Sequence, residues 1–282
     1  MSRTRDSARD ELDLAALERR QAKSLALDAR TPITRPAEAE RFLSGVGMAL
    51  RYGPTSGLPI ASLYQAFAGP RPAKNALTGA IGLTNGLLGR ARAIEVHVVA
   101  DRVTLVHRSV MPALYALVRR GRELEDLRGL SVNARTAVSL LRETKEATAG
   151  DVRRRLGLAA DPRHDPAYAA LAELEHLLLV DRGPFEIPKA GIPYLSKEGY
   201  PYHFFHEAHP ELAAAAARLT IDAAAAMFLM AYLTGAVFAR GRKLASMFKA
   251  FLSPAEIDEA LRRLAKQGKV DLFEGGVVVR AA

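Results

Sequence analysis

The spacing of hydrophobic residues changes from a helical to an alternating period in one order, and that order occurs three times along the chain. Between residues 36 and 92, apolar residues recur three or four positions apart in three segments, which predicts three helices. Residues 94–98 and 103–107 then alternate apolar and polar side chains, which predicts a β-hairpin that turns near Asp101. Three helices followed by a hairpin is the element order of a winged-helix unit.

The third predicted helix of this first unit begins at Lys74 and is rich in glycine. Its predicted inward positions are Leu77, Ile81, Leu87 and Leu88. Three interior glycines weaken the helix by up to about 1 kcal/mol each relative to alanine. In the hairpin, a turn at Asp101 and Arg102 would place Glu95 opposite Arg108, which predicts an ion pair across the strands.

The same order returns after residue 126 and again after residue 219. Thr148 and Ser253 are each followed three residues later by an acidic residue, a capping-box pattern that predicts the start of a helix. In the second copy, residues 180–202 form a long wing interrupted by proline and glycine. We predict a mainly α chain with small β-hairpins (α+β), divided into an N-terminal tail and helix at 1–35 and tandem winged-helix units at 36–125, 126–218 and 219–282.

Composition excludes several functional classes. The chain has 49% hydrophobic residues and no cysteine, so it can bury real cores but cannot form disulfides or thiolate metal sites. Residues 1–9 are predicted to be a disordered tail, and their mixture of acids and bases without an apolar run argues against a secretory signal, so we expect a cytoplasmic protein. The apolar stretch 221–239 is short and alanine-rich, which favours a buried helix over a membrane span. No nucleotide, hydrolase or metalloprotease signature occurs, and we expect no cofactor.

Charge is concentrated in the first unit. The segment from residue 41 to residue 122 holds eleven basic and two acidic residues, a net charge of +9, which equals the net charge of the whole chain. A basic charge confined to one segment indicates a polyanion-binding surface. We therefore predict that the partner is DNA, double-stranded and either damaged or intact, and we expect no membrane partner.

The candidate DNA contacts lie on the third helix of the first unit and around its hairpin. Asparagine can pair with adenine through two hydrogen bonds, and arginine contacts phosphate or guanine. The corresponding helices of the second and third units carry Glu173, Glu175, Glu256 and Asp258, which suits scaffold or dimer roles better than base reading. The predicted DNA-binding residues are Arg51, Arg71, Lys74, Asn75, Thr78, Asn85, Arg90, Arg92, Arg102 and Arg108.

Two further clusters leave alternatives open. His203, His206 and His209 are spaced like metal ligands, but zinc needs three or four converging ligands, so we predict no metal site and favour packing of an aromatic-rich segment. Neighbouring tyrosines could instead stack on an unpaired base. The run 153–155 of three arginines could contact phosphate or face Glu143 and Glu146.

The segments "RVTLVHRSVMPALYALV", "TAGDVRRRLGL" and "YPYHFFHEAHPEL", together with the tandem units, resemble the AlkZ/AlkX-type winged-helix proteins, which are bacterial DNA glycosylases and their relatives. The resemblance is nearest to the AlkZ-related branch and covers residues 36–282. It implies DNA binding, DNA repair and the hydrolysis of N-glycosidic bonds of damaged bases.

The sequence departs from this family at the catalytic position. The resemblance implies two glutamines separated by one residue that position the hydrolytic water, but the expected region reads "YGPTSGLPIASLYQA" and contains only Gln65. Tryptophan is also absent. Such hydrolysis needs a positioned water and a carboxylate or amide that stabilises an oxocarbenium-like centre, so the weak catalytic candidates are Gln65 and Glu95. The alternatives are a non-catalytic transcriptional regulator and a protein-interaction scaffold.

Overall fold

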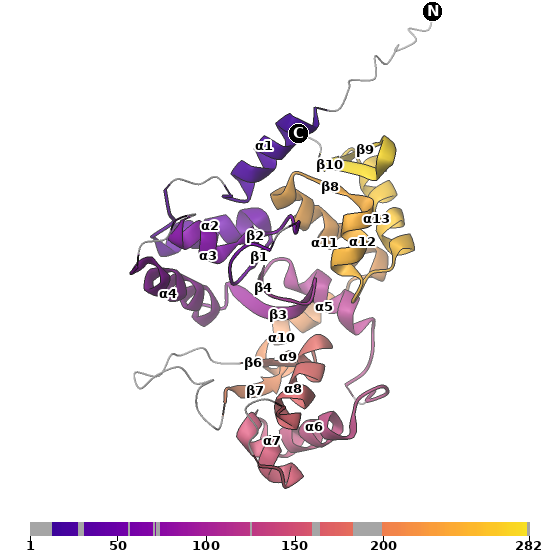
Figure 1. The fold of residues 1–282 in the computed structure, drawn as a ribbon. Helices are drawn as coiled ribbons and strands as arrows, with labels where there is room; N and C mark the ends of the chain where they lie inside the picture. Colours follow the sequence, from indigo (N-terminus) through magenta and orange to yellow (C-terminus); the bar gives the residue numbers. More distant parts are fainter. Residues whose placement is uncertain are drawn as a thin grey trace, which may run out of the picture.

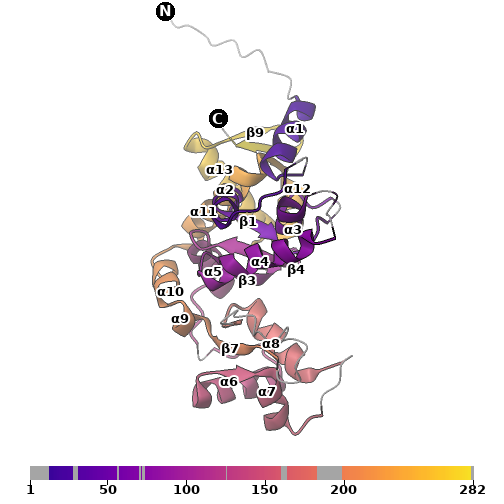
Figure 2. The same ribbon diagram turned by 90° about the vertical axis from the view of Figure 1, so that its left-hand side faces the viewer.

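The structure is a computed structural model, and it describes residues 13–27, 31–55, 57–69, 71, 74–124, 126–159, 164–182 and 199–280. The predicted disordered tail at 1–9, most of the predicted long wing and the predicted boundary at residue 125 lie outside this described part. In Figures 1 and 2 the elements stack along one axis, with α1 and α13 near one end and α6 and α7 at the other.

The N-terminal helix packs against the C-terminal part of the chain. Helix α1 (Leu14–Ser24) begins at Asp13, whose carboxylate accepts a hydrogen bond from the Ala16 N–H at 2.8 Å. The amide of Gln21 donates to the carbonyl oxygens of Ala236 at 2.5 Å and Phe238 at 3.0 Å. Leu17 joins a small apolar cluster with Val237, Phe238, Val277 and Val279 near the C-terminal end of the chain. The predicted amphipathic helix at 10–29 is therefore present in part and serves as a brace.

The first unit contains α2 (Pro36–Val46), β1 (Met48–Leu50), β2 (Ala61–Ser62), α3 (Leu63–Ala68), α4 (Ala76–Gly89), β3 (Ala93–Val99) and β4 (Arg102–His107). Its four strands lie in the order β2-β1-β4-β3. Gly47 adopts φ = 73° directly after α2, which ends the helix there because a residue with a Cβ is strained in that conformation. Helix α5 (Met111–Arg119) follows the hairpin.

The second unit contains α6 (Val132–Thr144), β5 (Ala147–Thr148), α7 (Ala149–Leu156), α8 (Pro166–His176), β6 (Val180–Arg182) and β7 (Pro201–Phe204). Two short helices, α9 (Phe205–Ala208) and α10 (Pro210–Ala216), lead to the third unit. The third unit contains α11 (Ile221–Ala236), β8 (Phe238–Arg240), α12 (Gly241–Phe248), α13 (Pro254–Lys266), β9 (Val270–Phe273) and β10 (Val277–Arg280). The predicted capping boxes at Thr148 and Ser253 are both present.

The three sheets share a three-stranded arrangement, to which the first sheet adds β2. In each unit a short strand after the first helix pairs antiparallel with the second strand of the hairpin, namely β1 with β4, β5 with β7 and β8 with β10. The chain is thus mainly helical with small sheets, as predicted from the hydrophobic spacing.

Part of the first unit's sheet shares a core with the third unit, whereas α2, α3 and α4 form a separate cluster with the rest of that sheet, and the second unit has its own core. One cluster joins residues of β3, α5, α10, α11, α12 and α13, and a separate cluster lies within α6, α7, α8 and their sheet. Helices α2 and α11 approach so closely at Gly235 that a Cβ there would lie 2.7 Å from the Cα of Val46. The first and third units therefore form one packed body.

Two local predictions were wrong. Helix α4 buries Ala80, Thr84, Leu87 and Leu88, and it leaves Leu77 and Ile81 48% and 43% exposed. In the hairpin, Val99 pairs with Arg102 around a two-residue turn, which places Glu95 opposite Leu105. Glu95 therefore does not face Arg108.

Among the described residues, no single helix is long and apolar enough to cross a membrane. Helices α10 and α11 reach the required length and hydropathy only as a pair, and a bend of 115° separates them. Much of α11 is buried between the first and third units, which agrees with the predicted buried helix at 221–239.

Candidate nucleic-acid interface

The outer face of α4 carries one line of polar and small residues. Asn75, Thr78, Gly82 and Asn85 are spaced three or four positions apart, so they follow one another along the side opposite the buried Ala80 and Leu87. Asn75 stands at the N-cap position but makes no capping hydrogen bond with its side chain. We call this line the α4 stripe. Its two amides are available to an incoming partner.

Glycines leave parts of the outer face of α4 without side chains. A Cβ added at Gly79, Gly82 or Gly86 would meet nothing within 4 Å, and none of the three has a positive φ. The fold of this chain therefore does not require glycine at these positions, although each one weakens the helix. Such residues allow the backbone of α4 to approach a neighbouring surface closely.

Basic residues stand at both ends of α4. Arg71 and Lys74 are exposed before its first turn, and Arg90 is exposed directly after its last. At the C-terminal end, Arg90 and Arg92 line a hollow of about 110 Å³ between α2 and α4. Arg92 also pairs with Glu40 of α2 at 3.2 Å. The free positive charge beside the α4 stripe is therefore carried mainly by Arg71, Lys74 and Arg90.

Charge in the first unit is less concentrated in space than along the sequence. Five of the eleven basic residues pair with carboxylates: Arg51 with Glu95, Arg92 with Glu40, Arg108 with Glu211, Arg120 with Glu256 and Arg122 with Asp126. Four of these carboxylates come from outside residues 41–122. The remaining cations without an ion pair to any described residue, apart from Arg119, are Arg41, Arg71, Lys74, Arg90 and Arg102.

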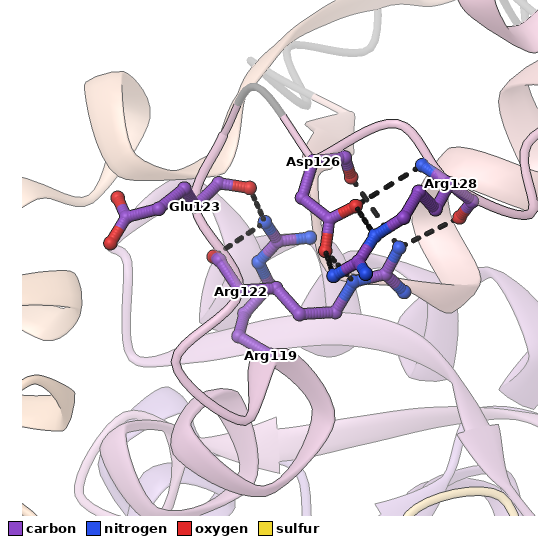
Figure 3. A network of polar contacts seen from close by, with 5 residues as sticks. All are labelled: Arg119, Arg122, Glu123, Asp126 and Arg128. Atoms are coloured by element: carbon purple, nitrogen blue, oxygen red, sulfur yellow. Dashed lines mark hydrogen bonds and ion pairs between the residues drawn. The ribbon is translucent and has the colours of Figure 1, made fainter.

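The arginines in the connection after α5 form hydrogen bonds and ion pairs within that connection. The buried guanidinium of Arg119 donates to the carbonyl oxygens of Arg122 at 3.0 Å and Glu123 at 3.1 Å (Figure 3). The guanidinium of Arg128 donates hydrogen bonds to both carboxylate oxygens of Asp126, at 2.7 and 2.8 Å. These hydrogen bonds hold the pKa of Asp126 well below its usual range. These arginines fix the path of the chain between the first two units, so their charge is already engaged.

Glu95 lies in a buried charged cluster between the first and second units. Its side chain is only 2% exposed, and it pairs with Arg51 and with Arg182 of β6. Arg182 also lies 3.0 Å from Glu175 of α8, and His97 lies 3.8 Å from Glu95. Sequence reasoning missed this cluster because Arg182 is 87 positions from Glu95 and no local pattern joins them.

Burial opposes both charges of the Arg182–Glu175 pair. It lowers the pKa of Arg182 and raises the pKa of Glu175 to about 7. The guanidinium of Arg182 also lies 5.6 Å from the ring centre of Tyr200, a cation–π contact. The charged forms of Arg182 and Glu175 are therefore stabilised by the ion pairs within the cluster. We interpret the cluster as a structural contact between the first and second units.

Gln65 is the other catalytic candidate, and it is tied to the N-terminal segment. Its amide nitrogen donates to the carbonyl oxygen of Leu27 at 2.8 Å. Its amide oxygen is buried and has no hydrogen-bond partner among the described residues. Gln65 lies on α3 and Glu95 on β3, and each is engaged by different parts of the chain.

The remaining predicted clusters are engaged in contacts within the chain. His209 lies 2.7 Å from Asp181 and His203 lies 3.4 Å from Glu146, and the described residues contain no group of ligands that could hold a metal ion. In the arginine run, Arg153 pairs with Asp165 and Arg155 pairs with Glu143. The acid-facing alternative for that run therefore fits Arg155.

The structure consists of repeated small helix–sheet units, and one polar, glycine-rich helix face is flanked by cations that form no ion pair with a described residue. The structure matches that of the Streptomyces sahachiroi DNA glycosylase AlkZ with a TM-score of 0.53, at 14% sequence identity, over 92% of this chain and 67% of the AlkZ chain. No family model matches the chain, and no curated protein matches it. The chain therefore has an AlkZ-like fold, which confirms the predicted resemblance at the level of the fold.

Proposed function

We propose that this chain is a DNA-binding protein related to DNA repair, built from three winged-helix units, which grips double-stranded DNA through the α4 stripe. The recurring topology of the three sheets supports the winged-helix assignment. The AlkZ-like fold supports DNA as the partner, because the matched protein is a DNA glycosylase.

The observation that carries the proposal is the α4 stripe with its flanking cations. An α-helix with its side chains is about 10–12 Å across and the major groove is about 12 Å wide, so α4 (14 residues) can lie in the groove as a recognition helix. Asn75 and Asn85 would face base edges, where asparagine pairs with adenine. Arg71, Lys74 and Arg90 would contact phosphates at the two ends of the helix.

In the second and third units, the helices that correspond to α4 are α8 and α13, and both carry acidic residues that form contacts within the chain. On α8, Glu173 accepts hydrogen bonds from the N–H and hydroxyl of Ser131, at 2.8 and 2.6 Å. On α13, Glu256 is held by Arg120 and Ser253. Acids in these positions repel phosphate, so in our proposal α8 and α13 position the first unit and do not read bases.

Salt dependence tests the proposal directly. Binding of the full chain to a labelled 20-base-pair duplex should weaken steeply with salt, because each neutralised phosphate releases counterions. Replacing Lys74 and Arg90 by methionine should reduce the log–log slope by about 2. The matched control changes Arg20 and Lys23 of α1 to methionine and should keep the wild-type slope. A wild-type slope near zero rules the proposal out.

Binding and base excision are separable. In our proposal Glu95 does not take part in hydrolysis, because its carboxylate is buried between two arginines, and Gln65 is held by Leu27. We therefore expect alkylated duplex DNA to be bound without the formation of abasic sites. Abasic sites that appear with the wild-type chain and disappear in a Gln65→Ala variant would contradict this part.

A transcriptional regulator would behave differently toward sequence. It would bind as a dimer and enrich a two-fold symmetric site from a random pool of oligonucleotides. The repair-related proposal predicts no such enrichment and a similar affinity for unrelated duplexes. Selection from a random pool, combined with sedimentation of the free chain, separates the two functions.

A further inference from the structure

The tip of the first hairpin is docked onto the third unit. Ala100 and Asp101 form its two-residue turn, and both have a positive φ, of 52° and 53°. This conformation is uncommon for residues with a Cβ. The N–H of Ala100 donates to the carbonyl oxygen of Met247 in α12 at 2.9 Å. Arg102 follows this turn directly, so the contact brings it close to α12.

A pocket of about 220 Å³ opens where the hairpin tip, the segment after β1 and α12 meet. Its polar lining consists of Thr55, Asp101, Arg102, Lys243, Ser246 and Lys249. A water molecule occupies about 30 Å³ in the liquid, so the pocket can hold one tetrahedral oxyanion with several waters.

Positive charge dominates this lining. Three cations face one carboxylate, and the only ion pair between them, Lys249 with Asp101, is long at 3.7 Å. The ammonium of Lys243 lies beside Gly57, where an added Cβ would be 3.9 Å away. Neither Arg102 nor Lys243 has an ion pair with a described residue. Cations held together with so little compensation attract an anion, and the hydroxyls of Thr55 and Ser246 can donate to it.

We propose that this pocket binds a phosphate group of a nucleic-acid backbone, and that the third unit contacts DNA through α12. The inference rests on the proposed DNA-binding function and adds a second anchor to it, outside the α4 stripe. Helix α13 exposes Asp258 and Glu259, so the helix that would read bases in a winged-helix unit repels DNA here, while the shorter α12 supplies the cations. The pocket belongs to the packed body of the first and third units, so both anchors move together.

The test uses the full chain with Lys243 and Lys249 both changed to methionine. This variant should bind the 20-base-pair duplex about tenfold more weakly at 100 mM salt, and its log–log salt slope should fall by about 1. The matched control changes Lys266 and Lys269 to methionine. These two exposed lysines of the same unit lie outside the pocket, so the control should keep the wild-type affinity and salt slope.

A second measurement separates this site from the proposed function. Thermal unfolding is followed with increasing inorganic phosphate at constant ionic strength. Phosphate should stabilise the wild type and the Lys266/Lys269 control but not the Lys243/Lys249 variant. If the wild type binds no DNA yet shows this pattern, the anion site stands and its source is free phosphate. If the two double variants behave alike in both measurements, the site is refuted even where the wild type binds DNA.

Discussion

At the scale of single residues, Gly235 sets how closely the first and third units can pack. A Cβ at this position would lie 2.7 Å from both the Cα and the carbonyl oxygen of Val46, and the backbone of α2 cannot yield cheaply. We expect Gly235→Ala to lower the free energy of unfolding by about 2 kcal/mol, even though alanine favours helix more than glycine does.

Urea unfolding measures this effect, and Gly45→Ala is the matched control. Gly45 lies within α2, where an added Cβ meets nothing within 4 Å, so the control should be neutral or stabilising. Equal effects of the two substitutions would mean that α2 and α11 are not in the close contact that joins the two units.

A second residue-scale prediction concerns Glu256 and acid. Hydrogen bonds from Arg120 lower the pKa of Glu256 from 4.5 to about 2. Because this pKa is lower in the folded chain than in the unfolded chain, ionised Glu256 stabilises the fold above about pH 4.5, and that contribution is lost as the pH falls toward 2. We expect Glu256→Gln to cost about 1 to 2 kcal/mol at pH 7, with the difference from wild type disappearing near pH 2.

Unfolding by urea at a series of pH values provides the measurement. Glu259→Gln is the control, because Glu259 lies on the same helix and its ion pair within the described part of the chain is with the exposed Arg262. The control should change stability by less than about 0.5 kcal/mol at every pH. A pH-independent cost at Glu256 would show that its role is only in capping α13.

At the scale of elements, the glycines of α4 offer a test in which stability and binding move in opposite directions. Gly82 lies in the middle of the α4 stripe with open space around it. Gly82→Leu should raise the free energy of unfolding by up to about 1 kcal/mol, since leucine favours helix. If α4 is the proposed recognition helix, this change should weaken DNA binding at least tenfold, because the leucine side chain would stand between the helix backbone and the groove.

Thermal unfolding and duplex binding of the same preparation measure the two effects. Gly45→Leu on α2 is the matched control and should stabilise the chain without loss of affinity. A Gly82→Leu variant that binds DNA like wild type would remove the α4 stripe from the interface.

Most helices and the first hairpin could be predicted from the sequence, but the short strands β1, β2, β5 and β8 and the orientation of α4 could not. The alternation in residues 94–107 corresponds to the β3–β4 hairpin, and both capping boxes marked helix starts. In α4, however, the buried positions include Ala80 and Thr84, while the larger Leu77 and Ile81 are exposed. The helix is apolar or small on nearly every side, so periodicity alone does not identify the inner face.

The long-range ion pairs also could not be predicted from local sequence patterns. Arg108 pairs with Glu211 and Arg120 pairs with Glu256, partners that are 103 and 136 positions away. The excess of +9 in residues 41–122 predicted a basic surface, yet the fold brings acids from other parts of the chain to several of those arginines. The cations left without an ion pair to a described residue are a smaller set, and their position depends on tertiary packing.

At the scale of the whole molecule, the cluster around Glu95 links a second unit with its own core to the body formed by the other two. Removing one charge from a buried network leaves its partner uncompensated, which commonly costs about 3 to 5 kcal/mol. We expect Glu95→Gln and Arg182→Met each to lower the free energy of unfolding by about 3 kcal/mol.

A double-mutant cycle is the decisive measurement, since the two residues belong to different units. The combined variant should cost at least about 1 kcal/mol less than the sum of the single effects, because each single substitution already removes the Glu95–Arg182 contact and the second cannot remove it again. The exposed pair of Arg155 and Glu143, treated in the same way, should show a coupling below about 1 kcal/mol. Additive effects at Glu95 and Arg182 would mean that the second unit is held by its apolar contacts alone. A strong coupling would mean that the charged cluster fixes where that unit stands relative to the α4 stripe.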